Sequence, residues 1–332
     1  MSTPKVLILY NQPVLPADHP EAESERSVID TADDLALILR EARHAVTTLG
    51  LGADPAALFQ TLRTEQPDVV FNLYEGTADR PETETYVAGI LDWCGVPYTG
   101  SPPAALALAR AKHTTKYLLQ GAGLPTARFQ VVHALPAPPS GIPFPVIVKP
   151  AEQDASVGID QASVCTDESQ LQKRVAQMLD AYGPPVLVEE YIPGREFNVA
   201  VIELPELQAM PPTELVVPEQ QPGVWSILTY DGKWKPGSIE YEKEAPLYPK
   251  DLDARKLDEL HQLAEAAYRL VGCRDYARVD FRMNPTGQLF ILEVNPNPEI
   301  RPQSGFASCL RTLDVAYVDF LVRLVSHAAA RR

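Results

Sequence analysis

Two short runs near the C-terminus carry residue types that ligate metals, at alternate positions. Residues 278–281 contain Arg278 and Asp280, and residues 293–295 contain Glu293 and Asn295. If both runs are strands, residues two apart share a face, so each pair of polar side chains lies on one side. A turn near residues 284–287, closed by a two-residue loop at Thr286-Gly287, sets Asp280 opposite Glu293 and Arg278 opposite Asn295.

Facing carboxylates destabilise a strand pair unless a cation lies between them. Carboxylate and amide oxygens suit Mg²⁺, including Mg²⁺ that carries the phosphates of a substrate. The spacing therefore predicts a magnesium site at Asp280, Glu293 and Asn295. A solvent-facing hairpin with scattered charges has the same alternation, and residues 278–295 alone do not separate the two interpretations.

A nucleotide would have to be held without the common phosphate-binding motifs. The chain contains neither G-x-x-x-x-G-K-[ST] nor a G-x-G-x-x-G after its first predicted strand. Lys149 ends the apolar run 145–148, and a short loop with Ser156 and Gly158 follows. A lysine beside free backbone N–H groups suits a phosphate or a base, although it is also typical of a lysine that reaches solvent. Glu189 and Glu190 end the next apolar run, where they would accept hydrogen bonds from an adenine and a ribose or simply add surface charge.

The elements that would position these residues begin with a parallel α/β layer. Between residue 5 and about residue 101 the pattern alternates between strands and helices. The predicted strands are 6–10, 45–49, 68–73 and 96–99, and the predicted helices are 28–42, 56–66 and 86–94.

The remainder predicts α+β structure. A helical stretch at 103–120 precedes strands at 128–133 and 145–149, a helix at 168–182 and a strand at 186–191. The last third opens with a strand at 196–203 and a proline-rich irregular stretch at 204–251, which is long enough to be a lid or binding element. It continues with an amphipathic helix at 253–271 that Gly272 ends, the carboxylate hairpin and a helix at 314–330.

Composition excludes several classes of protein. The chain has 332 residues and a formal net charge of −15, which argues against nucleic acid as a partner, since phosphate backbones bind basic surfaces. No apolar run is long enough to span a bilayer, so no membrane partner is expected, and the apolar N-terminal run reads as a buried strand and not as a signal peptide. The four cysteines show no zinc spacing, which favours reduced, mostly buried thiols and a cytoplasmic location.

The ensemble of motifs resembles one family. The pieces occur in the order and spacing of an ATP-grasp enzyme, and the chain resembles D-alanine:D-alanine ligases and their relatives over nearly its whole length. The matching pieces are Ser24-Glu25-Arg26, Pro97 to Ser101, the Lys112 region running into Gln120 to Pro125, Val148-Lys149-Pro150, Ser156-Val157-Gly158, Val188-Glu189, Gly194 to Phe197, Arg278-Val279-Asp280 and Leu292 to Asn295.

The resemblance implies a three-domain ATP-grasp architecture of the α/β and α+β classes. Residues 1–110 would form an N-terminal α/β substrate-binding domain and residues 111–190 a central ATP-grasp subdomain. Residues 191–332 would form the C-terminal domain with the metal site and a mobile loop. ATP would lie between the central and C-terminal domains, and a homodimer is implied.

The resemblance also implies roles for individual residues. Two Mg²⁺ ions, which Mn²⁺ could replace, would lie on Asp280, Glu293 and Asn295, and Arg278 would stabilise the oxyanion. The implied nucleotide-binding residues are Lys112, Lys149, Ser156, Gly158, Glu189, Glu190, Ile192, Glu196 and Lys233. The implied catalytic residues are Arg278, Lys233, Glu25 and Ser156, with Glu25 and Ser304 contacting substrate.

The implied chemistry joins a small carboxylate to a small amine. The carboxylate would attack the γ-phosphate of ATP to give an acyl phosphate, and the amine would then displace phosphate. Closure of the loop around Lys233 would exclude water.

The amino-acid half of the site departs from the family pattern. Residues 11–25 form a longer insert, and residues 72–84 replace a segment with an expected histidine. Asp154 and Ala155 replace Gly and Ser in the phosphate loop. Glu299 replaces a glycine and would repel an acceptor's carboxylate unless Arg301 pairs with it.

We therefore expect an ATP- and Mg²⁺-dependent carboxylate-amine ligase whose acceptor site is altered, with a different amine or a larger peptide as acceptor. A genuine D-alanine:D-alanine ligase, a kinase and an idle ATP-binding scaffold are the alternatives. The kinase is disfavoured by Arg278, which suits acyl chemistry.

Overall fold

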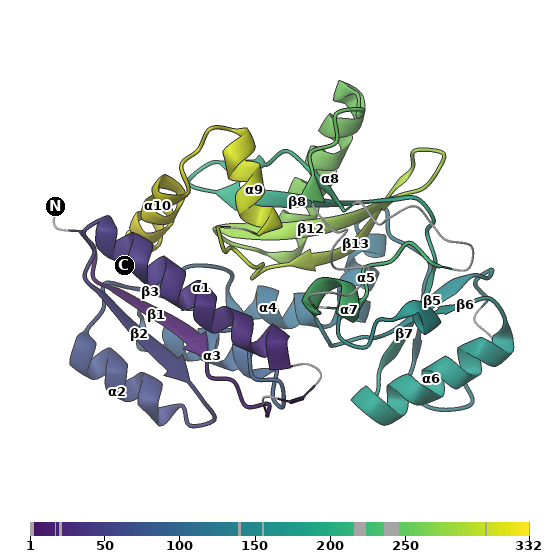
Figure 1. Cartoon of the computed structure of the whole chain (residues 1–332), viewed down its shortest axis with the longest axis horizontal. Helices are drawn as coiled ribbons and strands as arrows, with labels where there is room; N and C mark the ends of the chain where they lie inside the picture. The colour runs from purple at the N-terminus through teal and green to yellow at the C-terminus, as the bar shows by residue number, and fades with distance from the viewer. Residues whose placement is uncertain are drawn as a thin grey trace.

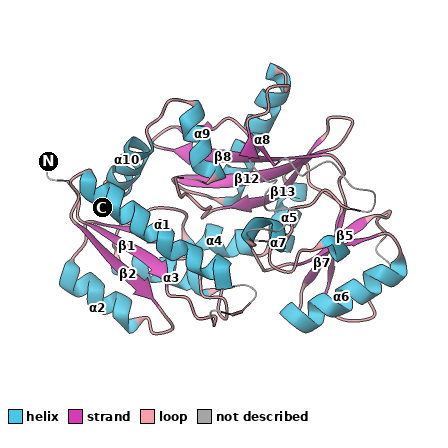
Figure 2. Cartoon of the chain, viewed as in Figure 1, coloured by secondary structure: helices cyan, strands magenta, loops and turns pink. Residues whose placement is uncertain are grey.

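The computed structural model describes residues 3–16, 18–19, 22–138, 141–154, 156–215, 224–235, 246–302 and 304–331. Its strands form three sheets, which stand apart as three groups of arrows in Figures 1 and 2. Each sheet falls within one of the three predicted segments, so the predicted mixture of α/β and α+β structure is confirmed. The domain boundaries themselves stay a prediction.

The N-terminal sheet is parallel, with strand order β2-β1-β3. Along β1, Val6 and Ile8 enter one core with helix α1, whereas Leu7 and Leu9 enter the core on the opposite face. A strand that is buried on both faces needs a continuous apolar run, which is what the sequence provides. The elements are β1 (Val6–Asn11), α1 (Ala22–Glu41), β2 (Val46–Leu51), α2 (Ala56–Glu65), β3 (Val69–Leu73) and α3 (Thr83–Cys94).

Two predictions in this layer need correction. The predicted strand at 96–99 is only an isolated parallel bridge between Tyr98 and Val70, because the segment contacts β3 at that one point. Helix α1 begins at Ala22, six residues before the predicted start, so Glu25 lies in its first turn.

The central sheet is antiparallel, with strand order β4-β7-β5-β6. Helix α6 spans the predicted residues, and its N-cap Asp167 accepts a hydrogen bond from the backbone N–H of Gln170. This helix lies along one side of the sheet, at the lower right of Figure 1. The elements are β4 (Phe129–Val132), β5 (Val146–Pro150), a 3-10 turn η1 (Gln161–Ser163), β6 (Val164–Cys165), α6 (Glu168–Tyr182) and β7 (Val186–Glu190).

The C-terminal sheet has the order β11-β10-β8-β12-β13, with β9 paired to β8. Helix α8 packs on it and ends at Gly272, whose φ of 77° suits glycine, as predicted. The described residues of the predicted irregular stretch 204–251 contain four short elements, and sequence analysis missed a helix, α9. The elements are β8 (Arg195–Glu203), β9 (Leu207–Ala209), β10 (Thr213–Leu215), α7 (Tyr230–Trp234), β11 (Pro246–Leu247), α8 (Ala254–Val271), β12 (Tyr276–Met283), β13 (Leu289–Asn295), α9 (Gly305–Thr312) and α10 (Tyr317–Ala329).

The predicted helix at 103–120 is wrong in one respect that matters for the site. It is two helices, α4 (Pro103–Arg110) and α5 (Lys112–Gly121), which break at Ala111 with φ −77° and ψ 77°. The backbone N–H of Lys112 donates to the carbonyl of Ala151 at 3.0 Å instead of continuing the helix. The break therefore starts a helix at Lys112, beside the segment that follows β5.

The four cysteines are free thiols that differ in exposure. Cys165, Cys273 and Cys309 are buried free thiols and Cys94 is an exposed one. Among the described residues, no helix is both long enough and apolar enough to cross a bilayer.

Candidate functional site

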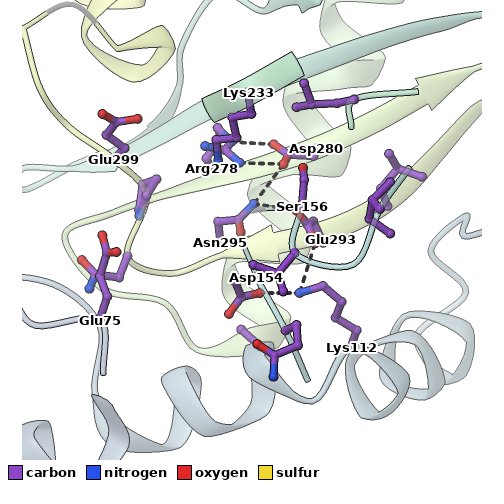
Figure 3. A pocket seen from close by; sticks show the side chains of 18 of the residues that line it. Glu75, Lys112, Asp154, Ser156, Lys233, Arg278, Asp280, Glu293, Asn295 and Glu299 are labelled. Atoms are coloured by element: carbon purple, nitrogen blue, oxygen red, sulfur yellow. Dashed lines mark hydrogen bonds and ion pairs between the residues drawn. The ribbon is translucent and has the colours of Figure 1, made fainter. Parts of the chain in front are cut away.

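A cleft of about 930 Å³ lies where the three sheets meet. Its walls come from the ends of β5 and β7, from β12 and β13, from α7 and from loops of the N-terminal layer. Every predicted site residue except Gly158 lines this cleft. These lining residues are Glu25, Lys112, Lys149, Ser156, Glu189, Glu190, Ile192, Glu196, Lys233, Arg278, Asp280, Glu293, Asn295 and Ser304. Figure 3 shows the part around the carboxylate hairpin.

The carboxylate hairpin has the predicted register at its functional end. Asp280 pairs with Glu293 and Arg278 with Asn295. The predicted two-residue loop is wrong, because the N–H of Asn284 bonds the carbonyl of Gln288 at 3.0 Å and leaves three residues in the loop. A bulge between Asp280 and Phe281 shifts the register by one residue and cancels that difference.

The hairpin carboxylates form ion pairs with neighbouring cations and accept hydrogen bonds from neighbouring amides. Arg278 donates two hydrogen bonds to Asp280, at 2.7 and 2.8 Å, and the amides of Asn198 and Asn295 donate at 2.8 and 2.9 Å. Lys112 lies 3.4 Å from Glu293. Burial raises the pKa of Asp280, whereas for Glu293 the cations Lys112, Lys149 and Arg278 outweigh burial and lower the pKa.

These groups fit a magnesium ion by donor type. Two carboxylates face each other across one strand pair, and the amide of Asn295 beside them would complete an all-oxygen donor set if it turned its oxygen toward an ion. The oxygen atoms of Asp280 and Glu293 lie within reach of one amide, Nδ2 of Asn295, at 2.9 and 3.5 Å. The three side chains therefore converge on one small volume of the cleft.

A buried group of charges lies at the end of the cleft that β5 and β7 form. Glu189 forms ion pairs with Lys149 at 2.7 Å and with Lys116 at 2.8 Å. Lys116 also donates to Thr126, and burial lowers the pKa of its ammonium group. Sequence reasoning missed Lys116, although it follows Lys112 by four residues and so shares a face of the same helix.

The phosphate loop carries its own acidic residue. Asp154 forms an ion pair with Lys112, and Arg110 lies 3.9 Å from the same carboxylate. Asp154 and Glu293 outweigh burial and raise the pKa of Lys112. In Figure 3 dashed lines join the ammonium group of Lys112 to the carboxylates of both Asp154 and Glu293. Lys112 is therefore placed to exchange a carboxylate partner for a phosphate.

Two other predicted nucleotide ligands have different surroundings. Glu190 pairs with the exposed Arg128 at 2.9 Å, so its carboxylate is engaged at the surface. Gly158 adopts φ 74°, and a Cβ there would lie 2.9 Å from the ring of Tyr182. The loop after β5 therefore requires glycine at this position for packing.

Lys233 reaches the cleft from α7. The hydroxyl of Thr229 caps this helix by accepting from the N–H of Gly232, and the N–H of Tyr230 donates to the carbonyl of Ile159 at 3.0 Å. Burial and the nearby Arg278 lower the pKa of Lys233. Figure 3 shows Lys233 beside Arg278 above the hairpin.

Both predicted substrate residues are bonded to backbone. Glu25 accepts from the N–H groups of Val14, Leu15 and Ala78 at 2.8–3.1 Å. Ser304 accepts from the N–H of Ala307 and caps α9. This geometry suits residues that fix the walls of the cleft, and their contact with a substrate stays a prediction.

Three further glutamates define the end of the cleft near Glu25, which we call the substrate end. Glu84 pairs with Arg110 at 2.9 Å, and Glu299 pairs with Arg301. Glu75 has no side-chain hydrogen bond or ion pair to any residue that the structure describes. The residue is exposed to the open cleft, and partial loss of water around the carboxyl between the cleft walls, together with Glu84 and Glu299, raises its pKa to about 8. Glu75 was not among the predicted site residues, because one glutamate in a loop carries no spacing signal.

Comparison with known proteins identifies relatives along the whole chain. Residues 118–326 match the family model for the D-ala D-ala ligase C-terminus. The chain is 32% identical to an uncharacterized protein of Sinorhizobium fredii, over 91% of this chain and 88% of the relative. It is 32% identical to the D-alanine–D-alanine ligase of Gluconobacter oxydans over 93% of this chain and 96% of that one. The ligase of Granulibacter bethesdensis is 31% identical, with both chains fully covered.

Solved structures give the same fold. The D-alanine–D-alanine ligase from Bacillus anthracis complexed with ATP superposes with a TM-score of 0.76 over 98% of both chains, at 17% identity. The same protein in a second structure, without ATP in its description, matches with the same score. The three-sheet architecture around the cleft is therefore the ATP-grasp architecture. The chain belongs to the D-alanine:D-alanine ligase family, whose members are ATP-dependent carbon-nitrogen ligases that use Mg²⁺.

Proposed function

We propose that this protein is an ATP- and Mg²⁺-dependent carboxylate-amine ligase that acts through an acyl phosphate and takes an acceptor other than D-alanine. The observation that carries the proposal is the division of the cleft. One end holds paired charges of the types that bind ATP and a metal, and the substrate end holds carboxylates in excess. The family relationship supports the first part, and the residues of the substrate end support the second.

The nucleotide would bind at the end that contains Lys149, Glu189, Ile192 and Glu196. Lys149 and Lys112 carry charges of the right sign for phosphates, and Glu189 and Glu196 supply acceptors for an amine and for hydroxyls. Two Mg²⁺ ions, or Mn²⁺ in their place, would be held by Asp280, Glu293 and Asn295. The metal supplies charge neutralisation for the transferred phosphoryl group.

The protein's own groups account for the remaining steps. Lys233 would hold the transferred phosphoryl group, and its segment would keep water from the acyl phosphate. Arg278 would stabilise the negative charge that builds on the acyl oxygen when the amine attacks. Both cations lie together above the hairpin, so one charged patch serves both steps.

The acceptor proposal rests on Glu75 and Glu299. Arg301 pairs with Glu299, which offsets the repulsion expected from Glu299 alone, but the pair leaves no free cation of Arg301 for an acceptor's carboxylate. Glu75, without a described side-chain partner, has its pKa raised to about 8, so its carboxylate would form when an acceptor's ammonium group binds beside it and offsets the unfavourable charge. A carboxylate of D-alanine would be repelled there, whereas an amine without a carboxylate, or one with a second ammonium group, would be attracted.

The test is phosphate release from ATP and Mg²⁺ across D- and L-amino acids, dipeptides, diamines and polyamines. The proposal predicts turnover with an amine that lacks the carboxylate next to it, coupled to the mass of a new amide. Glu293→Gln serves as the blank.

Each alternative has its own outcome in this assay. Turnover with D-alanine alone would establish a genuine D-alanine:D-alanine ligase. No Mg²⁺-dependent binding of ATP would favour the idle scaffold. A homodimer and the domain boundaries at residues 110 and 190 remain predictions, which sedimentation and limited proteolysis would check.

A further inference from the structure

Arg282 lies on the face of β12 that carries the metal-ligand residues. Residues 278, 280 and 282 alternate with buried apolar residues, so Arg282 is one step beyond Asp280 on the same face. Its backbone pairs with Glu196 of β8, and only 4% of the residue is exposed. A guanidinium group that is buried to this degree needs partners for its donors, and these partners show what it connects.

The guanidinium of Arg282 donates hydrogen bonds to residues of three segments. Nε and Nη2 donate to Oε2 of Glu196 at 3.1 and 2.9 Å, and Nη1 donates to the carbonyl of Ile192 at 3.0 Å. Nη2 also donates to the carbonyl of Ser226, and the guanidinium lies over the ring of Tyr191 at 5.6 Å. Arg282 therefore links the nucleotide end of the cleft to the segment that later carries Lys233.

The first residues of that segment, which spans residues 224–235, are held by hydrogen bonds from two side chains. On one side Arg282 holds Ser226. On the other, Gln161 bonds both the N–H and the carbonyl of Trp225, at 2.8 and 3.3 Å. The ring of Trp225 packs edge-to-face on Tyr191 at 5.1 Å. The position of Lys233 in the cleft therefore depends on contacts that begin beside the nucleotide end.

We propose that Arg282 is a positioning residue that couples nucleotide binding to the docking of the 224–235 segment. The inference rests on the proposed function in one respect, the assignment of Glu196 and Ile192 to the nucleotide. Both bonds from Arg282 to Glu196 use Oε2, which leaves Oε1 for a ligand hydroxyl. A ligand that fixes Glu196 fixes the guanidinium, and the guanidinium fixes Ser226 and the start of the segment.

The test uses Arg282→Met and Arg282→Lys with Mg²⁺ and an ATP analogue that cannot transfer its γ-phosphoryl group. Trp225 and Trp234 report on the segment by fluorescence, in a Trp93→Phe background that removes the 92% exposed tryptophan of α3. We expect the analogue to bind about tenfold more weakly to Arg282→Met, a loss of about 1.4 kcal/mol, and the fluorescence response to disappear. Arg282→Lys, which keeps one donor group, should keep part of both.

Two further variants separate coupling from a local effect. Arg269→Met, which removes an arginine that is 62% exposed on α8, should change neither readout. Gln161→Leu releases Trp225 without touching Glu196 or Ile192, so it should reduce the fluorescence response, and its effect should not add to that of Arg282→Met.

Two results would overturn the inference. The first is unchanged analogue affinity in folded Arg282→Met, or in Arg282→Lys if the methionine variant does not fold. The second is weakened affinity with a full fluorescence response, which would leave Arg282 a local support of Glu196. Neither result depends on amide formation, so a failed ligase assay and a failed coupling test are distinguishable.

Discussion

The two ends of the cleft treat charge in opposite ways. At the nucleotide end Glu189 is buried between two lysines, and the charges of Lys116 and Lys149 outweigh burial and lower its pKa. At the substrate end Glu75 has no described partner, and its pKa is raised to about 8. Both residues are glutamates on the wall of one cleft, but Glu189 is buried with two cations beside it, whereas Glu75 is exposed with two other glutamates nearby.

The contrast indicates which half of the chemistry is prepared in advance. A nucleotide site with fixed cations can bind the same phosphates in every turnover, and fixed charges cost no reorganisation when the reaction occurs. At the substrate end the carboxyl of Glu75 gives up its proton only when a cationic ligand or a high pH favours the carboxylate, and a group of this kind helps a site to discriminate between ligands. We therefore expect the substrate end, and not the nucleotide end, to determine which acceptor this protein takes.

The largest effect is expected at the boundary between the two ends. Glu293→Gln removes one of the two facing carboxylates while keeping its size, so kcat should fall by at least about 100-fold. The loss should not be restored by raising Mg²⁺. Steady-state phosphate release measures it, with Glu41→Gln, an exposed glutamate of α1, as the control. A variant with more than a tenth of the wild-type rate would remove Glu293 from the metal site.

The next effect breaks the nucleotide end. Glu189→Gln leaves the ammonium groups of Lys116 and Lys149 buried without their carboxylate, and such a loss costs about 3–5 kcal/mol. Urea unfolding in the absence of nucleotide measures the free energy of unfolding directly. A loss below about 1 kcal/mol would show that the paired charges do not stabilise the empty protein.

A smaller effect is expected at Asp154, which is half-exposed in the phosphate loop. Asp154→Asn frees Lys112 from its ion pair and should strengthen binding of a Mg²⁺-nucleotide about 2–5-fold, because exposed pairs are worth about 0.2–1 kcal/mol. Titration at low and at high salt measures the gain, which should shrink with salt. Weaker binding would mean that Asp154 assists the nucleotide instead of competing with it.

The smallest effect has the opposite sign to that at Glu189. The pKa of Glu75 is raised to about 8 in the folded chain from an unfolded value of 4.5, so the folded chain holds this proton more tightly. Its contribution to stability is full below about pH 4.5 and is lost as the pH rises to about 8. Because Glu75 is exposed, solvent screens most of this effect, so Glu75→Gln should raise Tm only on the order of 2 °C at pH 9 and leave it unchanged at pH 4.

Thermal unfolding at both pH values checks this prediction, again with Glu41→Gln as the control. Equal Tm values for wild type and Glu75→Gln at pH 9 would mean that the cleft leaves Glu75 fully solvated, and the charge contrast between the two ends would disappear.

The sequence predicted most elements and the opposition of Asp280 and Glu293, because alternation and order along the chain are local signals. The predicted pairing of Asp280 with Glu293 is correct, but the predicted two-residue loop is not. The loop has three residues, and the bulge after Asp280 offsets the extra residue. Neither deviation has a residue pattern that differs from a regular hairpin. The predicted register therefore held only at the functional end.

Long-range contacts explain what sequence reasoning missed. The break before Lys112 depends on a bond to Ala151, and the burial of Lys116 depends on Glu189, which lies 73 residues further along the chain. In the sequence Arg282 looks like an ordinary strand residue. Its role depends on Glu196, Ile192 and Ser226, which only the fold brings together around it. Such groups are recognisable only when segments far apart in the sequence are placed side by side.

The central claim is that Glu75 helps to select the acceptor. The most direct test compares the rates of amide formation with D-alanine and with a diamine as acceptors, in the wild type and in Glu75→Gln. The account predicts that the wild type prefers the diamine and that Glu75→Gln raises KM for the diamine while kcat changes little. A wild type that prefers D-alanine, with the same KM in Glu75→Gln, would contradict the claim that unpaired charge at the substrate end selects the acceptor.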